Sequence, residues 1–366
     1  MIIPNAKPGV MRIKPYVAGE SNLEGCGKII KLSSNEGALG PSPKAQAAYT
    51  KSAAEINRYP DGSATELRKA IAETHNIDSD QIVCGAGSDE LISLLCTCYA
   101  SEGDEVLYSQ YGFLMYPISA MAAGATPVAA PETCLTANVD ALLSAVTDRT
   151  RILFLANPNN PTGTYLSTNE VKRLRDNLRE DVLLVIDAAY AEYISHDDYT
   201  TGVELVDAGN NVIMTRTFSK IHGLGGVRLG WAYGPVNVID VLNRARGPFN
   251  VNSAALNAGV AAIHDQAFTR KSFLHNLKWL AWTRDQLREL DLKVTDSVGN
   301  FLLVEFDEKS PKNATAADEF LKGAGIIVRS VASYGLPNHL RITIGTDKEM
   351  HSVIDALCQF MGKISD

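Results

Sequence analysis

A single lysine, Lys220, stands where an apolar strand pattern meets a glycine-rich turn, in the segment TRTFSKIHGLGGVRLGWAY. Thr217 and Ser219 precede this lysine and Arg228 follows it. Hydroxyl groups and an arginine form one half of an anion site. Three readings are open for the lysine: a solvated surface amine, a phosphate ligand or a covalent catalyst. Near other cations and partly desolvated, its pKa would fall below the ordinary ~10.4, giving a usable amine nucleophile.

The other half of such an anion site is offered where QIVCGAG runs into SDELISLLCTCYA. Gly87, Ser88 and Asp89 lie where a strand ends and an amphipathic helix begins. The first N–H groups and the dipole of such a helix favour an anion. The alternative is a plain N-cap, because serine and aspartate cap helices in any case. The segment contains neither the GKS or GKT of a nucleotide loop nor a GxGxxG fingerprint.

Three further strand patterns each end in a candidate residue. DEVLYSQ is followed by Tyr111, which either stacks on a flat ligand or belongs to the core. RILFLAN leads into NPNNPTG, where Asn160 either donates an amide hydrogen bond or simply completes a turn. VLLVIDAAYAEY places Asp187 after a run of aliphatic residues, with Tyr190 three residues later. An unpaired buried carboxylate is costly, so Asp187 needs a cationic partner unless it caps the next helix.

The elements that must position these residues are short strands, several of them apolar on both faces, separated by helices such as STNEVKRLRDNLRED. This pattern indicates an α/β fold with a mostly parallel sheet sandwiched by helices. Ligands of such sheets bind at the carboxyl ends of the strands. GVRLGWAYG closes the series, in a direction that the pattern leaves open. We predict an N-terminal arm over 1–40 that contributes to the small domain and to a dimer contact, a large domain over 41–265 and a smaller α+β domain over 266–366. The smaller domain should contain strands at FLLVEF, GIIVRSV and HLRITIG.

The composition excludes several classes of protein. The chain has 366 residues, of which 45% are hydrophobic and 21% charged, as in globular enzymes. A net charge of −8 argues against nucleic-acid binding. We find no signal-peptide pattern and no membrane span, and we expect a cytoplasmic protein. Six cysteines do not make a disulfide scaffold, and Cys96 and Cys98 lack the neighbours that a zinc site needs.

One cofactor would use all of these candidates. Pyridoxal phosphate needs a phosphate cup, a stacking aromatic ring, an acid beside its pyridinium nitrogen, donors to its phenolate oxygen and a lysine for a Schiff base. Asp187 would keep the ring nitrogen protonated so that the ring accepts electrons. Lys220 would be the covalent lysine and later the base that moves the substrate proton.

The order and spacing of the motifs resemble the fold-type-I pyridoxal-phosphate aminotransferases, and within them the histidinol-phosphate aminotransferase group. The motifs cover nearly the whole chain: KPYVAG, SSNEGALGPSP, RYPDG, GAGSDELI, NPNNPTG, DAAYAEY, TFSKIHGLGGVRLGW and LRITIG. The resemblance implies that Lys220, Asp187 and Tyr190 are catalytic, that Asn160 and Tyr190 contact the phenolate oxygen, and that Tyr111 stacks on the ring. It places around the phosphate Gly87, Ser88, Asp89, Thr217, Ser219 and Arg228.

The resemblance also implies a homodimer with composite sites, because Tyr59 would reach the cofactor phosphate of the neighbouring subunit. Arg341 would hold a substrate carboxylate in a bidentate fork. Arg329, with Tyr16, would bind the phosphate of histidinol phosphate, although a surface salt bridge is the alternative for Arg329. SSNEGALGPSP departs from the usual SSNENPLGPSP near the substrate, which bears on substrate choice. Gly226 replaces a common alanine.

The activity implied is transamination between histidinol phosphate and 2-oxoglutarate, a step of histidine biosynthesis, with a small-molecule amino donor and a 2-oxo acid as partners. The nearest alternatives are phenylalanine or tyrosine transamination, and decarboxylation of threonine phosphate. A non-catalytic ligand sensor would belong to a different class. Such regulators carry a DNA-binding module, and the first forty residues show no helix-turn-helix pattern.

Overall fold

The computed structural model describes residues 4–23 and 29–363. Its larger sheet has the strand order β2-β8-β7-β6-β5-β3-β4. β8 is antiparallel to both of its neighbours, and the other pairs are parallel. The predicted mostly parallel sheet is confirmed, and the direction that the sequence left open is antiparallel. The strands are β2 (Ile82–Gly85), β3 (Glu105–Ser109), β4 (Thr126–Ala130), β5 (Thr150–Ala156), β6 (Leu183–Asp187), β7 (Val212–Thr217) and β8 (Gly230–Tyr233).

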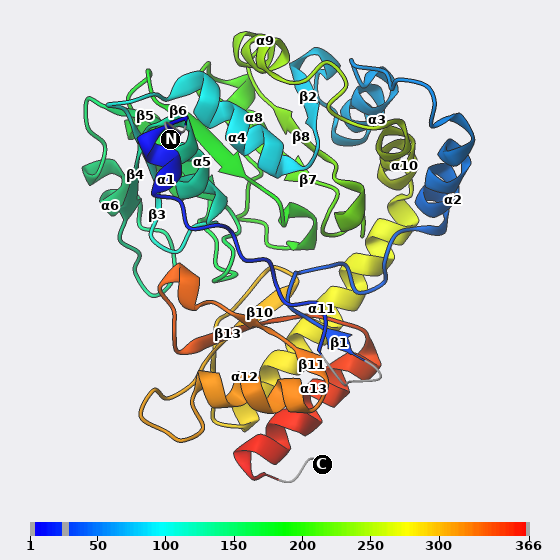
Figure 1. The fold of residues 1–366 in the computed structure, drawn as a ribbon, viewed down its shortest axis with the longest axis vertical. Coiled ribbons are helices and arrows are strands. Elements are labelled where there is room, and N and C mark those ends of the chain that lie inside the picture. The colour runs from blue at the N-terminus through cyan, green and yellow to red at the C-terminus, as the bar shows by residue number, and fades with distance from the viewer. Residues whose placement is uncertain (1–3, 24–28, 364–366) are drawn as a thin grey trace.

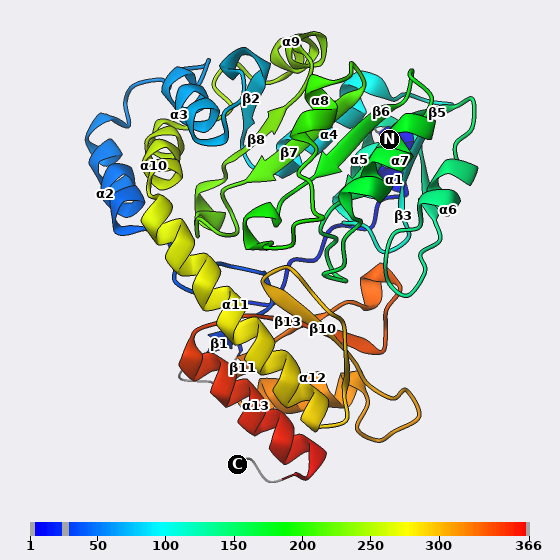
Figure 2. The same cartoon turned by 180° about the vertical axis from the view of Figure 1, so that it is seen from behind.

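Helices cover both faces of this sheet (Figures 1 and 2). On one face, buried side chains of the strands pack with α4 (Ser88–Tyr99), α5 (Met115–Ala123) and α9 (Val236–Ala245). The other face packs against α3 (Thr65–His75), α6 (Val139–Ser144), α7 (Thr168–Asn177), α8 (Val203–Asp207) and α10 (Ser253–His264), and α2 (Pro43–Lys51) lies beside α10. Successive residues of a strand point to opposite faces, so a sheet covered on both sides needs strands that are apolar throughout.

The smaller α+β part has an antiparallel sheet in the order β12-β13-β10-β9. Its strands are β9 (Lys293–Val294), β10 (Phe301–Glu305), β12 (Arg329–Ser330) and β13 (His339–Thr343), and its helices are α12 (Ala314–Gly323) and α13 (Asp347–Met361). The long helix α11 (Gln266–Glu289) runs from the larger part into the smaller one (Figure 2). The domain limits at residues 40 and 265 remain predictions.

Two short elements interrupt the predicted N-terminal arm. α1 (Pro8–Met11) packs against α5 so closely that a Cβ on Gly9 would lie 2.2 Å from the carbonyl oxygen of Met121. β1 (Ile30–Lys31) pairs in parallel with β11 (Ile326–Ile327) of the smaller part. The arm therefore joins the two parts of the molecule before the chain turns back to α2 (Figure 1).

Some expectations differ from the structure in detail. The predicted strand GIIVRSV is divided between β11 and β12, which belong to different sheets. Cys96 is buried, Cys98 is half-buried, and no group of His, Cys, Asp and Glu in the described part of the chain could hold a metal ion. Within residues 4–23 and 29–363, no helix has the length and apolar character that crossing a membrane requires.

Candidate active site

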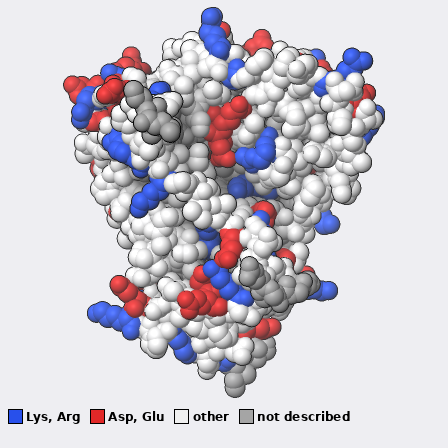
Figure 3. Space-filling model, viewed as in Figure 1, with Lys and Arg blue, Asp and Glu red and all other residues white. Residues whose placement is uncertain are grey.

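A pocket of about 270 Å³ opens where the strand ends of the larger sheet face the smaller part. β6 ends at Asp187, β7 ends at Thr217, and α4 begins at Ser88 directly after β2. Both acidic and basic side chains border the hollow on the face drawn in Figure 3. Twelve of the predicted site residues line the pocket: Tyr16, Ser88, Asp89, Asn160, Asp187, Tyr190, Thr217, Ser219, Lys220, Arg228, Arg329 and Arg341.

Asp187 is a buried carboxylate with only 6% of its surface exposed. Its Oδ2 atom accepts a 2.7 Å hydrogen bond from the hydroxyl of Tyr116, whereas Oδ1 is buried and has no hydrogen-bond partner in the described part of the chain. Burial raises the pKa of Asp187 to about 6, although the Tyr116 hydrogen bond lowers it. The unpaired oxygen is therefore a strong acceptor that can bind a donor or a cation in the pocket.

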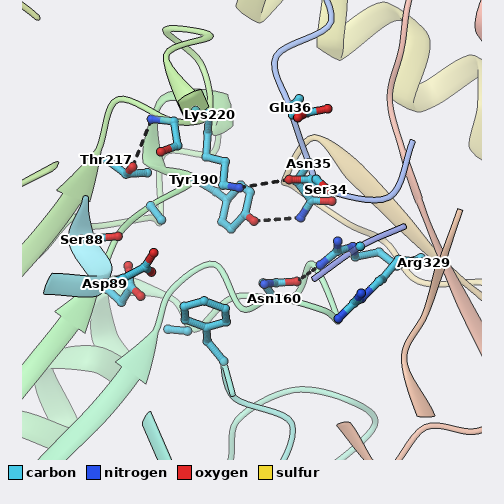
Figure 4. Close-up of a pocket in the computed structure, with 18 of the residues that line it drawn as sticks. Ser34, Asn35, Glu36, Ser88, Asp89, Asn160, Tyr190, Thr217, Lys220 and Arg329 are labelled. Atoms are coloured by element: carbon cyan, nitrogen blue, oxygen red, sulfur yellow. Dashed lines mark hydrogen bonds between the residues drawn. The ribbon is translucent and has the colours of Figure 1, made fainter. Parts of the chain in front are cut away.

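Lys220 and Tyr190 point toward the segment that includes Ser34 and Asn35 (Figure 4). The Nζ atom of Lys220 donates to the carbonyl oxygen of Ser34 at 3.3 Å and lies 5.7 Å from the ring centroid of Tyr190. The amide of Asn35 donates to the Tyr190 hydroxyl at 2.8 Å. Since that hydroxyl oxygen is already an acceptor, its own proton is free to be donated elsewhere.

Asn35 was missed from the sequence. It is fully buried at a φ of 54°. Its backbone N–H donates to the hydroxyl of Thr343, and that hydroxyl donates in turn to the side-chain Oδ1 of Asn35. Asn300 donates to its carbonyl oxygen. Asparagine adopts positive φ more readily than most residues. The motif SSNE pointed to this segment, but only the contacts with distant residues show that Asn35 orients the Tyr190 hydroxyl.

The start of α4 faces Arg228. The Nη2 atom of Arg228 donates to Asp89 Oδ2 at 2.9 Å, and its Nη1 atom reaches Ser219 Oγ at 3.5 Å. Gly87 has a φ of 90°, and a Cβ there would lie 2.4 Å from Arg228 Nη2. Thr217 Oγ1 accepts from the Ser219 amide. Helix N–H groups, hydroxyls and a guanidinium converge here as an anion site requires, and only glycine leaves room for the arginine.

Arg341 connects three segments of the chain. Its side chain is nearly fully buried, its Nη1 atom donates to Asn160 Oδ1, and its Nη2 atom donates to the carbonyl oxygen of Ser33 at 2.7 Å. Burial lowers the pKa of Arg341. Because Asn160 accepts through its oxygen, its amide N–H groups remain available as donors toward the pocket.

Arg329 reaches the same pocket from β12. Its Nη2 atom donates to the carbonyl oxygen of Val17 at 2.8 Å, and its guanidinium lies 6.0 Å from the ring centroid of Tyr16. No side-chain salt bridge of Arg329 is present in the described part of the chain, so the surface-pair alternative has no support here. With Lys220, Arg228 and Arg341 it gives the pocket four cationic side chains against three carboxylates, Glu36, Asp89 and Asp187.

Three predicted residues do not line the pocket. Gly87 lies beside Arg228, as described above. Tyr59 is 82% exposed and stacks on Phe249, with ring centroids 4.7 Å apart. Tyr111 packs against a cluster of buried residues in the smaller part that includes Tyr334, and its amide donates to Glu132.

Phe113, two residues after Tyr111, lines the pocket. The Gly112 amide donates to the carbonyl oxygen of Ser109 at 2.7 Å and closes a turn that contains Tyr111 and precedes Phe113. The sequence pattern pointed to the aromatic residue next to the strand, but a turn can direct either ring to the site. Phe113 therefore replaces Tyr111 as our candidate for stacking on a flat ligand.

A buried charged cluster lies behind the site and was also missed. Arg216 on β7 donates to Glu192 at 2.7 Å, and His222 lies 4.0 Å from the same carboxylate. Burial alone would raise the pKa of Glu192, but Arg216 and His222 outweigh it and leave that pKa below its ordinary value. Glu192 follows Tyr190 by two residues and His222 follows Lys220 by two. The cluster therefore braces both functional segments.

The family model for aminotransferase class I and II matches residues 27–357. The chain belongs to this family. It is 60% identical to histidinol-phosphate aminotransferase of Paramagnetospirillum magneticum over 99% of this chain and 100% of that protein, and 59% identical to that of Rhodospirillum rubrum over 98% of each.

A solved structure agrees with the fold. The crystal structure of histidinol-phosphate aminotransferase from Sinorhizobium meliloti in complex with pyridoxal-5'-phosphate matches with a TM-score of 0.91 at 26% identity, covering 99% of this chain and 98% of that one. The fold-type-I architecture predicted from the motifs is thereby confirmed.

The raised pKa of Asp187 predicts a pH dependence of stability. A carboxyl group whose pKa rises from 3.8 to about 6 on folding is tolerated protonated and costly when ionised. The cofactor-free protein should lose roughly 3 kcal/mol of unfolding free energy as the pH rises from about 4 through 6. Urea unfolding across this range, compared with Asp187→Asn, isolates the effect. Equal pH slopes in the two proteins would contradict it.

The buried pair behind the site predicts a large effect of Glu192→Gln. The variant leaves Arg216 buried beside a neutral partner, so the free energy of unfolding should fall by about 3–5 kcal/mol. Chemical denaturation measures this change. Glu66→Gln, which removes one partner of the exposed Lys69–Glu66 pair, is the matched control and should change stability little. A similar small change in both variants would show that the cluster does not brace the segments.

Proposed function

We propose that this chain is a pyridoxal-phosphate-dependent transaminase that converts histidinol phosphate and 2-oxoglutarate to imidazole-acetol phosphate and glutamate. The carrying observation is the unpaired buried Oδ1 of Asp187 at the same pocket as Lys220 and the anion site at α4. Full-length identity near 60% to histidinol-phosphate aminotransferases supports the choice of substrate.

The residues present fit the cofactor. Asp187 Oδ1 is an orphaned buried acceptor suited to a protonated ring nitrogen, and Gly87 leaves open the space beside Arg228 in which a phosphate would be held. In this proposal the phosphate contacts come from Gly87, Ser88, Asp89, Thr217, Ser219 and Arg228. Phe113 stacks on the ring in place of Tyr111. Tyr190 and the amide of Asn160 donate to the phenolate oxygen of the cofactor.

When bound, pyridoxal phosphate supplies an aldehyde that takes up the amino group and a ring that accepts electrons from the substrate carbon. Lys220 supplies the amine that holds the cofactor covalently. Its Nζ, once free, would take the proton from the substrate carbon and deliver it to the cofactor carbon that retains the amino nitrogen. Asp187 would stabilise the positive charge of the ring nitrogen. Because Asn35 donates to the Tyr190 hydroxyl oxygen, the proton of that hydroxyl would be directed to the phenolate oxygen of the cofactor.

The arginines provide substrate recognition in this proposal. Histidinol phosphate and 2-oxoglutarate are both anions, and the pocket has more cationic than acidic side chains. Arg341 holds the carboxylate of the 2-oxo acid, and Arg329 with Tyr16 binds the phosphate of the amino donor. A cytoplasmic location of the chain remains our prediction.

We also propose a homodimer with composite sites. Tyr59, Ile56 and Phe249 are exposed apolar side chains at 82%, 84% and 47%, and Tyr59 lies outside its own pocket. Exposed apolar groups of this kind mark interaction surfaces. A second copy of the chain would cover them and receive the Tyr59 hydroxyl at its cofactor phosphate.

A direct assay tests the function. The purified protein, supplied with pyridoxal phosphate and 2-oxoglutarate, should form glutamate with histidinol phosphate faster than with phenylalanine. Threonine phosphate should give neither glutamate nor carbon dioxide. Lys220→Ala should reduce the rate at least about 100-fold and abolish covalent attachment of the cofactor. Lys172→Ala, an exposed lysine on α7, is the control. No glutamate with any of these amines would overturn the proposal.

Mixing two inactive variants tests the composite site. If Tyr59 serves the partner subunit, Tyr59→Ala and Lys220→Ala proteins that exchange subunits form mixed dimers with one intact site. Random exchange should restore roughly a quarter of wild-type activity, because about half of the dimers are mixed and each has one working site of two. Sedimentation measures the oligomeric state, and we expect a dimer. Recovery near zero in exchanged dimers would place Tyr59 at the site of its own subunit, whereas wild-type activity of Tyr59→Ala alone would place it at neither site.

A further inference from the structure

Tyr116 makes a contact that the proposed chemistry has not used. It lies on α5, is fully buried, and donates its hydroxyl proton to Asp187 Oδ2 at 2.7 Å. Its ring is held on several sides. It is parallel to Phe154 with centroids 4.5 Å apart at 5°, and Phe113 meets it edge-on at 5.9 Å and 89°. A ring packed in this way keeps its hydroxyl in one place.

The two oxygens of Asp187 are therefore unequal. Oδ2 is bound by Tyr116, while Oδ1 is buried without a partner among residues 4–23 and 29–363. The backbone of Asp187 is fixed independently, since its carbonyl oxygen accepts from the Asn157 amide at 2.9 Å within the sheet. The strand thus sets where the carboxyl group begins, and the Tyr116 hydroxyl sets its rotation about the last side-chain bond.

We propose that Tyr116 is a positioning residue for the cofactor: its hydroxyl holds the Asp187 carboxylate so that Oδ1 faces the ring nitrogen. This inference rests on the proposed function. A hydrogen bond to a charged acceptor contributes more than one between neutral groups, and a rigid donor keeps the second oxygen aimed without reorganisation when the cofactor enters.

Electrostatics agrees with this geometry. Burial raises the pKa of Asp187, the Tyr116 hydrogen bond lowers it, and Asp89 from the start of α4 raises it. Thr215 on β7 and the Ala189 amide lower it further. Without the Tyr116 hydroxyl, the carboxyl group would keep its proton to a higher pH. A protonated carboxyl group has no charge to offer a pyridinium nitrogen.

The test is Tyr116→Phe, which removes the hydroxyl and keeps the ring stack on Phe154. Titration of the cofactor-free protein with pyridoxal phosphate should show affinity weakened by about 10-fold to 100-fold. The acidic limb of the affinity–pH profile should move to higher pH. In turnover, kcat should fall more than KM changes, because Asp187 supports charge that develops on the ring and does not touch the substrate. Tyr108→Phe, a half-buried neighbour whose ring lies 6.4 Å away, should match wild type.

A double-variant cycle separates positioning from general packing. In an Asp187→Asn background, Tyr116→Phe should change cofactor affinity by less than about 2-fold, since the charge that the hydroxyl orients is gone. Equal losses in both backgrounds, or no loss in the single variant, would overturn the proposal. If Tyr116→Phe alone failed to fold while the double variant folded, the hydroxyl would still act through Asp187, as proposed. Wild-type protein that binds no pyridoxal phosphate would overturn this inference and the proposed function together, whereas wild-type binding with an unaffected variant overturns this inference alone.

Discussion

The site depends on keeping one carboxylate, Asp187, charged inside a protein core. Removing a carboxylate from water costs several kcal/mol unless hydrogen bonds and opposite charges offset it. The structure supplies one donor from Tyr116 and leaves the second oxygen unpaired, so a cationic ring nitrogen would complete the balance. The neighbouring Lys220 and Arg228 add positive charge to the same pocket. Without the cofactor, the desolvation cost of the Asp187 carboxylate is only partly offset, and a bound cationic ring nitrogen would offset the rest.

The pocket unites segments that a sheet edge alone would not bring together. The strand ends deliver Asp187 and Thr217, as expected for a parallel sheet. The N-terminal segment adds Asn35, which holds the Tyr190 hydroxyl as an acceptor. The smaller part adds Arg341, whose guanidinium bridges the loop after β5 and the N-terminal segment. Cofactor-facing and substrate-facing groups thus share hydrogen bonds, so neither set can shift alone.

The sequence predicted what depends on strand ends and local patterns, and missed what depends on how loops turn. The parallel sheet, and the delivery of Asp187 and Lys220 to one pocket, follow from apolar strands and their last residues. Tyr111 and Phe113 differ by two positions in a tight turn, whose direction no periodicity encodes. Arg216 reads as an ordinary strand residue, because its buried partner Glu192 comes from a separate segment. The strand pattern GIIVRSV gave no sign that it divides between two sheets, since each half is completed by a different distant partner.

The pairing of β1 with β11 has a consequence for how the molecule is made. Ile30 and Lys31 pair with a strand almost three hundred residues later, and Asn300 donates to the carbonyl oxygens of Asn35 and Glu36. During translation the N-terminal segment leaves the ribosome first, yet its partners are among the last residues to emerge. The larger sheet can assemble while synthesis continues, but the pocket closes only when the final third of the chain has left the ribosome.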